Sequence, residues 1–314
     1  MLNIISKLKQ KGILGINRRN AVYVFENNSR SLYQLVDDKL RTKKLAQDNG
    51  ITIPQLYGTI RSHRAVKDIH GLVEQYSDFV IKPAHGSGGN GILIISGRSK
   101  DAYKKVSGNL LDREDIEHYV SNILSGMYSL GGQTDVAMIE FRVKISPVFE
   151  SISYLGTPDI RIIVFRGVPV MAMARLPTRM SDGRANLHQG AIGAGIDVTT
   201  GVTTFAVWGN ETITEHPDTD QSIRGVEIPD WEHLLSLSSK CYDITGLGYL
   251  GVDIVLDENQ GPMVLELNAR PGLNIQIANM AGLEKRLRIV ESKGERLANI
   301  DQRVVFAKKY MRHS

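Results

Sequence analysis

The chain has 314 residues, of which 42% are hydrophobic and 23% are charged, and its net charge is +4. The composition is typical of a soluble globular protein and does not demand a disordered region. The length predicts about two domains or one large α/β unit. The single cysteine, Cys241, excludes a disulfide framework and a cysteine metal site, which favours a reducing cytoplasm. Because Lys7, Lys9 and Lys11 interrupt the apolar N-terminal residues, neither a signal peptide nor a transmembrane segment is expected.

Positive charge is concentrated at both ends of the chain. Five Lys and Arg residues precede the first acid, Glu26, and Lys308, Lys309 and Arg312 lie near the C-terminus. Such ends can meet an acidic polypeptide, an anionic membrane surface or nucleic acid, although a solvated face is the commoner explanation. An acidic partner at the termini is therefore a hypothesis. No nucleic-acid partner is expected, because the sequence has no base-stacking or zinc-finger pattern.

The first half of the chain is predicted to mix helices and strands. Residues 1–37 form a short segment with one strand-like run, AVYVF, at 21–25. Helices are expected over 38–49, within 63–76 and within 109–129, and strands over 78–82, 92–96 and 136–145.

Antiparallel hairpins are predicted to dominate the second half. One hairpin pairs 159–165 with 168–176 through Arg166 and Gly167. A second glycine-bearing loop, RANLHQGAIGAGID, follows at 184–197, and a helix opened by Asp230 is expected over 230–245. Hairpins without strict alternation of strand and helix predict an α+β fold with antiparallel sheets.

The last predicted hairpin carries two acids in an apolar setting. Its strands flank the turn DENQG, and with the turn centred at 259–260, Asp253 and Glu266 lie directly opposite each other. Asn268 lies two residues further along on the same face. Facing acids in apolar strands need a cation, and oxygen ligands suit Mg²⁺ or Mn²⁺. The alternative is that both acids are solvated on the open face of a sheet.

A glycine-rich loop, KPAHGSGGNGI at 82–92, connects two predicted strands. Its glycines allow positive φ angles and close approach of backbone N–H groups to phosphate oxygens, and Lys82 adds charge. No helix follows directly, so the loop is neither a P-loop nor a dinucleotide-binding loop. A flexible flap over a nucleotide is favoured over an ordinary hairpin loop.

Two single residues are ambiguous on sequence alone. Glu140 lies in an apolar run, where its carboxylate needs a partner such as an adenine amino group. His188 is more often a structural hydrogen-bonding residue than a catalytic base when it stands alone.

Taken in the order of the chain, over about residues 38–272, these motifs resemble those of the ATP-grasp ligases. Among these ligases they are similar to the RimK-type α-L-glutamate ligases. The resemblance implies an ATP-grasp fold in which two α+β subdomains with antiparallel sheets sandwich ATP. It implies a short basic segment (1–37), a subdomain with the glycine flap (38–143), a subdomain with the metal site (144–290) and a basic tail (291–314).

The resemblance also implies a role for each matching residue. The ATP contacts it implies are Lys39 and Lys82 at the phosphates, the flap residues Gly86, Ser87, Gly88, Gly89 and Gly91, and Glu140, Phe141 and Val143 at adenine. The catalytic set is Arg175, Lys82, Asn186 and His188, and the Mg²⁺ or Mn²⁺ ligands are Asp253, Glu266 and Asn268. The substrate contacts are Asp159, Arg161, Arg270 and Gly272.

The implied reaction is ADP-forming ligation of a carboxylate to an amine through an acylphosphate, in which an amino acid such as glutamate joins a peptide, a protein or a small acid. A kinase that stops at phosphoryl transfer and a nucleotide-binding regulatory protein are the alternatives. The segment ahead of Lys39 is shorter, and the connector 144–158 longer, than is usual in the family. The substrates, the ribose contact and a homo-oligomeric state therefore stay open.

Overall fold

The computed structural model describes residues 6–8, 10–86, 89–100, 102–294 and 297–312. The chain divides into two compact units. The large unit comprises Met1–Asp37, Arg41–Thr52 and Ile145–Ser314, and the small unit comprises Asp38–Leu40 and Ile53–Lys144. Each unit contains its own antiparallel sheet, as the α+β prediction requires.

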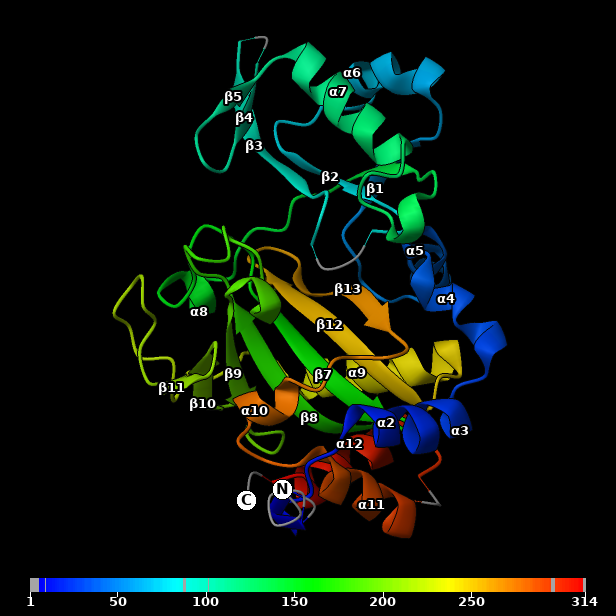
Figure 1. Ribbon diagram of the computed structural model, residues 1–314, viewed down its shortest axis with the longest axis vertical. Helices are drawn as coiled ribbons and strands as arrows, with labels where there is room; N and C mark the ends of the chain where they lie inside the picture. The colour runs from blue at the N-terminus through cyan, green and yellow to red at the C-terminus, as the bar shows by residue number, and fades with distance from the viewer. Residues whose placement is uncertain (1–5, 9, 87–88, 101, 295–296, 313–314) are drawn as a thin grey trace. The chain divides into compact units, whose positions relative to one another are not determined.

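The small unit is built on a six-stranded antiparallel sheet in the order β1-β6-β2-β3-β4-β5. Its strands are β1 Leu56–Ile60, β2 Phe79–Pro83, β3 Leu93–Ser99, β4 Ala102–Lys105, β5 Leu110–Leu111 and β6 Ala137–Glu140. Its helices are the 3₁₀ helix His63–Asp68, α6 Ile69–Leu72, α7 Arg113–Leu124 and the 3₁₀ turn Leu130–Gly132. Helices α6 and α7 lie beside these strands in Figure 1 and share one apolar core with them.

Helix α7 shows how the sequence determines an element of this unit. Asp112 and Asp115 form a capping box, in which each side chain accepts the other's backbone N–H. Ile116, Val120 and Ile123 recur at helical spacing and are fully buried in the core. The predicted helix is confirmed, although it is shorter than the range 109–129 within which it was expected.

The large unit is built on a seven-stranded antiparallel sheet in the order β11-β10-β9-β8-β7-β12-β13. Its strands are β7 Asp159–Phe165, β8 Val168–Leu176, β9 Ile192–Ile196, β10 Thr203–Trp208, β11 Glu211–Ile213, β12 Tyr249–Asp257 and β13 Gly261–Asn268. Figure 1 shows β7, β8 and β12 side by side in this sheet. Both predicted hairpins are confirmed.

Helices cover this sheet at several places. The longer ones are α9 Trp231–Thr245, α11 Leu283–Lys293 and α12 Ile300–Tyr310, and the short ones are α8 Pro147–Glu150, the 3₁₀ helix Leu187–Gln189 and α10 Ile275–Ala278. Helix α9 contacts β7, β8 and β12, and α12 contacts both α9 and β8. Asp230 occupies the N-cap of α9 as predicted, but its side chain makes no capping hydrogen bond. Near the C-terminus, Lys308 forms an ion pair with Glu232 at 2.8 Å.

The N-terminal segment is helical, so the strand predicted at 21–25 is wrong. Its elements are α2 Ile16–Arg18, the π-helical segment Arg19–Val24, α3 Phe25–Asn27, the 3₁₀ turn Arg30–Leu32, α4 Gln34–Asp37 and α5 Lys39–Asp48. The adjacent residues Tyr23 and Val24 are both buried, which a half-buried strand would not allow. The Tyr23 ring lies 5.5 Å from that of Phe165, edge to face, so tertiary packing overrides the local pattern.

Two further predictions need correction. Strand β6 ends at Glu140, whereas a strand was expected over the whole range 136–145. The second glycine-bearing loop is only partly a loop, because its IGAGI run forms β9. Gly195 in β9 marks a close backbone approach, since a Cβ there would lie 2.6 Å from the Ala278 carbonyl oxygen.

None of the helices in the described part of the chain is long and apolar enough to cross a membrane.

Candidate active site

The β12–β13 hairpin brings the two predicted acids together. Asp253 pairs directly with Glu266, and Gly251 pairs with Asn268, which lies two residues beyond Glu266 on the same strand. The predicted register of the acids is therefore confirmed. The side chain of Asp253 is only 1% exposed, so this carboxylate is not a solvated residue on an open sheet face.

The hairpin reaches this register by a route that the sequence did not indicate. Asp257 pairs with Gly261, so the turn is centred on Asn259 rather than between 259 and 260. That offset alone would misalign the acids. A register shift between Asp253 and the next residue of β12, with Leu265 as the extra residue of β13, restores the pairing.

Strands β7 and β8 add two arginines and a third acid beside this hairpin. Arg161 of β7 lies directly opposite Asp253, and Asp159 of β7 lies directly opposite Arg175 of β8. Directly opposite residues project from the same face of a sheet, so the β-sheet register alone brings these charges together. The network needs the strand order β8-β7-β12, which joins distant parts of the chain.

Hydrogen bonds link these side chains into one network. Arg161 donates from Nε and Nη2 to the two carboxylate oxygens of Asp253, at 2.7 and 2.6 Å. Arg175 donates from Nε and Nη2 to Asp159, at 2.5 and 2.6 Å, and from Nη2 to Asp253 Oδ2 at 2.8 Å. Asn268 Nδ2 donates to the same Oδ2 at 3.4 Å. Arg175 thus bridges both aspartates.

The ionisation of this network follows from burial and from its two cations. Burial favours the neutral acid at Asp253, but Arg161 and Arg175 outweigh it and hold the pKa of that carboxyl below its usual range. Burial raises the pKa of Asp159 to about 6, because Arg175 compensates only in part and Asp253 adds repulsion. Burial opposes the charge on Arg175, yet Asp159 and Asp253 raise its pKa above the ordinary value.

The residues present fit a hard divalent cation. Asp253, Glu266 and Asn268 offer two carboxylates and one amide oxygen, which are ligands that Mg²⁺ accepts. Glu266 is half-buried and accepts no hydrogen bond from another described residue, so its oxygens stay open to a ligand. Among the described residues no three His, Cys, Asp or Glu side chains cluster as a metal site, so the amide would be required.

In the small unit, Lys82 and Glu140 form a buried ion pair between β2 and β6. The side chains are 7% and 3% exposed, so the partner that buried Glu140 requires is supplied by Lys82. Directly after β6, Phe141 donates its backbone N–H to the Gln55 carbonyl oxygen at 2.8 Å. Val143, the third residue expected at adenine, is buried in the same irregular segment.

The glycine-rich loop connects β2 and β3, which pair antiparallel as predicted. Gly89 and Gly91 have φ angles of +79° and +74°, which only glycine adopts readily. The predicted flap residues Ser87 and Gly88 lie outside the described residues.

Lys39, the first residue of α5, contacts the beginning of this loop. Its ammonium group donates to the carbonyl oxygens of Gly86 at 2.5 Å and Ala84 at 3.4 Å. The structure therefore brings two of the residues expected at phosphate, Lys39 and Gly86, into direct contact.

Asp135 anchors the same loop and was not expected from the sequence. It accepts hydrogen bonds from the His85 backbone and ring, from the Ser129 hydroxyl and from the Val136 N–H. Burial favours the neutral acid, but these donors outweigh it and hold the pKa of Asp135 below its ordinary value. The sequence around Asp135, a single acid before an apolar run, does not indicate that it anchors the loop. The groups that donate hydrogen bonds to Asp135 come from two different loops.

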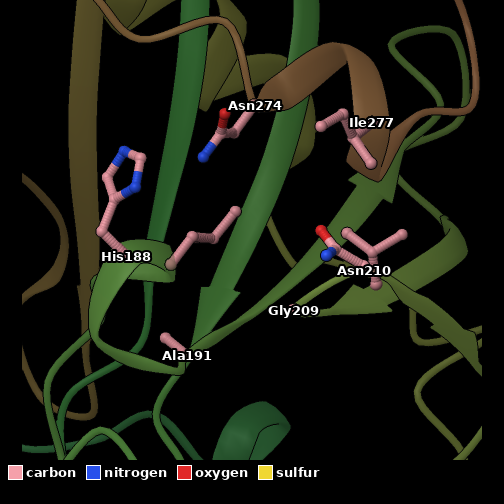
Figure 2. A pocket seen from close by; sticks show the side chains of 8 residues that line it. His188, Ala191, Gly209, Asn210, Asn274 and Ile277 are labelled. Carbon is pink, nitrogen blue, oxygen red and sulfur yellow. The ribbon is translucent and has the colours of Figure 1, made fainter.

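A pocket of about 310 Å³ opens elsewhere in the large unit, near the NLHQG motif. Its lining residues are Leu187, His188, Ala191, Val207, Gly209, Asn210, Asn274 and Ile277. Figure 2 shows His188 and Asn274 on one side and Asn210 and Ile277 on the other. Asn186 does not line the pocket; its side chain accepts the His188 backbone N–H at 3.0 Å and so shapes the turn.

The segment after β13 holds the remaining predicted substrate contacts. The Arg270 guanidinium lies 5.2 Å from the centre of the Tyr33 ring and is exposed. Arg19 donates to the carbonyl oxygens of Arg270 at 3.5 Å and Pro271 at 2.8 Å, which ties this segment to the N-terminal helices. Gly272 follows on the surface.

Comparison with known proteins decides the family. Residues 18–292 match the model of a family described as sugar-transfer associated ATP-grasp. The chain belongs to this ATP-grasp family. The expected ATP-grasp resemblance is therefore confirmed over most of its length.

The ATP-grasp chain also resembles individual proteins. A probable alpha-L-glutamate ligase from Maridesulfovibrio salexigens is 26% identical over 241 residues, which cover 75% of this chain and 56% of that protein. One from Enterobacter sp. (strain 638) is 24% identical with the same coverage. The chain thus spans little more than half the length of these relatives. A biotin carboxylase–β,γ-ATP complex from Campylobacter jejuni matches with a TM-score of 0.52 and 16% identity, over 86% of this chain and 49% of that one, which supports the fold alone.

Most of the predicted site residues of this ATP-grasp protein fall into three groups. One hydrogen-bonded network contains Asp159, Arg161, Arg175, Asp253 and Asn268, and it borders Glu266. In the small unit, Lys82 contacts Glu140 and Lys39 contacts Gly86. His188 belongs to the separate pocket, and no hydrogen bond among the described residues joins it to the arginine–aspartate network.

Proposed function

We propose that this ATP-grasp protein is an ATP-dependent, ADP-forming ligase that joins a carboxylate to an amine. The observation that carries the proposal is the buried network of two arginines and two aspartates beside Glu266. Its position next to an oxygen-only ligand set suits a reaction that moves negative charge between phosphate and carboxylate oxygens.

The reaction has two steps that balance without a redox partner. A carboxylate oxygen of one substrate attacks the γ-phosphorus of ATP, which releases ADP and leaves an acylphosphate. The amine nitrogen of the second substrate then attacks the acyl carbon, and phosphate leaves as the nitrogen loses a proton. Arg175 stabilises negative charge on the transferring phosphoryl group in the first step and on the departing phosphate in the second, with His188 and Asn186 on the substrate side.

The remaining residues bind and position ATP and its cation. Lys39, Lys82 and the glycine loop Gly86–Gly91 contact the phosphates, and Glu140, Phe141 and Val143 hold adenine. Asp253, Glu266 and Asn268 would hold Mg²⁺, which neutralises phosphate oxygens when it is bound. Support comes from the oxygen-only donor set and from membership of an ATP-grasp family. A biotin carboxylase of similar fold is described as a complex with an ATP compound.

Glutamate is the first amine substrate to test, because both curated relatives are described as probable alpha-L-glutamate ligases. Arg161 and exposed Arg270 are the cations that would meet the substrate carboxylates. The pocket at His188 has no Lys, Arg, Asp or Glu among its lining residues, so it suits an uncharged part of the second substrate. Its volume is near the lower end of the roughly 300–1,000 Å³ typical of ligand sites.

The proposal predicts that purified protein with ATP and Mg²⁺ releases ADP and phosphate only when an acid and an amine are both supplied. Release of AMP and pyrophosphate would contradict it. A phosphorylated product that persists without any amine would identify a kinase instead.

Glu266→Gln tests the metal ligands within that assay. The substitution keeps the shape of the side chain but removes the charge opposite Asp253, and we expect turnover to fall by about 100-fold or more. Glu258→Gln is the matched control, because Glu258 is exposed in the turn of the same hairpin and should leave turnover unchanged. Equal activity of both variants would remove Glu266 from the site.

A further inference from the structure

Oδ2 of the Asp253 carboxylate has no remaining capacity for a ligand in the arrangement that the structure describes. The carboxylate accepts four hydrogen bonds, two from Arg161, one from Arg175 and one from Asn268. Each carboxylate oxygen has about two lone-pair positions, so Oδ1 keeps one position and Oδ2, with three donors, keeps none. Asn268, a neighbouring ligand in the proposed set, also contacts Oδ2. A cation shared with Asn268 can therefore reach Asp253 only after a donor leaves Oδ2.

Arg175 is the donor that can leave Asp253 most readily. Arg161 makes both of its hydrogen bonds in the network to Asp253, so its departure would give up a complete bidentate pair. Arg175 makes only one of its three to Asp253 and keeps a bidentate pair with Asp159. Asp159 thus acts as a positioning residue that retains Arg175 within the site after Asp253 is released.

Asn268 must change as well. It presents its amide nitrogen to Asp253, at 3.4 Å, whereas a cation requires the amide oxygen. This hydrogen bond is long, so turning the amide over loses little. Release of Arg175 and rotation of Asn268 both free the same carboxylate oxygen.

The charges of the site favour binding of the cation and of phosphate together. Asp159, Asp253 and Glu266 face Arg161 and Arg175, so the ionised group carries one net negative charge. A divalent cation alone would reverse that sign and leave Arg175 without its second acid. Phosphate oxygens of ATP supply the anion that Arg175 then lacks.

We propose that Arg175 exchanges Asp253 for a phosphate group, so that binding of the divalent cation and binding of ATP are mutually dependent. The inference rests on the proposed function, because it assumes that Asp253 is a metal ligand. It assigns two new roles: Arg175 competes with the cation when nucleotide is absent, and Asp159 holds Arg175 in reach of the phosphate.

The test measures cation affinity rather than turnover. Mn²⁺ is titrated into the full chain, and free Mn²⁺ is followed by electron paramagnetic resonance, with and without a non-hydrolysable ATP analogue. The Mn²⁺ that the analogue chelates by itself is measured without protein and subtracted. The wild type should bind Mn²⁺ weakly alone, and the analogue should tighten binding by about tenfold or more, within the range typical of coupled sites. Arg175→Gln should tighten binding of Mn²⁺ alone by about tenfold and weaken the effect of the analogue.

Two further variants separate this exchange from a general loss of structure. Asp159→Asn should weaken Mn²⁺ binding, which is the opposite sign to Arg175→Gln, because Arg175 then depends on Asp253 alone. Arg166→Gln is the matched charge control, since Arg166 lies in the turn at the far end of the same β7–β8 hairpin, and it should change nothing. Circular dichroism checks that each variant is folded.

The outcomes distinguish the inference from the proposed function. If the analogue promotes Mn²⁺ binding in the wild type but Arg175→Gln leaves the affinity for Mn²⁺ alone unchanged or weaker, the exchange is wrong and the metal site stands. If the wild type binds no Mn²⁺ even with the analogue, the metal assignment, the exchange and the proposed function all fail.

Discussion

The two units solve the problem of buried charge in different ways. In the small unit, Lys82 and Glu140 form a pair of one cation and one acid between neighbouring strands. In the large unit, Arg175 is shared between Asp159 and Asp253, and Asp253 is shared between two arginines. The charges of the pair cancel, whereas the shared network can lose the contact between Arg175 and Asp253 and keep the others.

This difference indicates where ligands can exchange with protein groups. Removing one partner of a buried pair of one cation and one acid leaves the other charge buried without that partner, which is costly. Breaking the contact between Arg175 and Asp253 leaves each of these two charges with another partner, Asp159 and Arg161 respectively. A site that must accept and release a cation is therefore better built from the large-unit network than from a pair such as Lys82 and Glu140.

The largest effect should come from breaking the pair between Lys82 and Glu140. Lys82→Met leaves the Glu140 carboxylate buried, and we expect it to lower the free energy of unfolding of the small unit by about 3–5 kcal/mol. Hydrogen exchange of the β2 and β6 amides reports on this unit specifically. The double variant Lys82→Met/Glu140→Leu should regain most of the loss, and Lys104→Met, at an exposed position of the same sheet, should be neutral. A loss below about 1 kcal/mol in the single variant would contradict the comparison.

An intermediate effect is expected in the shared network. Arg161→Gln removes the bidentate partner of Asp253, but Asp253 keeps Arg175, so the unfolding free energy of the large unit should fall by about 2 kcal/mol. Urea denaturation measures the change, with Arg166→Gln as the control. If Arg161→Gln lowered the free energy of unfolding by more than Lys82→Met does, the shared network would not be more tolerant of a lost partner than the pair in the small unit.

Some of these features follow from the sequence and others do not. The pairing of Asp253 with Glu266 could be predicted, because both residues belong to one hairpin and a short turn restricts the register. The Lys82–Glu140 pair could not, because it requires β6 to lie beside β2 in the sheet. The helical form of 21–25 was missed because it depends on the packing of Tyr23 against Phe165, far along the chain.

The same distinction applies to the proposed catalytic arginine. The family resemblance implied a role for Arg175, but its two aspartate partners follow only from the order of three strands. Family resemblance thus identifies residues more readily than the contacts among them.

The smallest predicted effect concerns Asp135, a lone acid that is stabilised by hydrogen bonds rather than by a shared network. Its folded pKa lies below the ordinary value of 3.8, so its stabilising contribution is present above that pH and is lost as the pH falls through the lower folded value. Asp135→Asn should cost about 1–2 kcal/mol near neutral pH, because its donors lose a charged acceptor. The difference between wild type and variant should shrink below about pH 4 in denaturation series. A difference that grows on acidification would reverse the assigned sign.

The Leu265 bulge separates the tip of the β12–β13 hairpin from its acids. Residues between Asp257 and Gly261 sit on the far side of that irregularity from Glu266. Lengthening a surface loop adds only a modest entropic cost, roughly 0.6 kcal/mol for each doubling of its length. The exposed Asn259 is thus a suitable place to insert a peptide tag or a reporter. Such an insertion should leave Asp253 paired with Glu266.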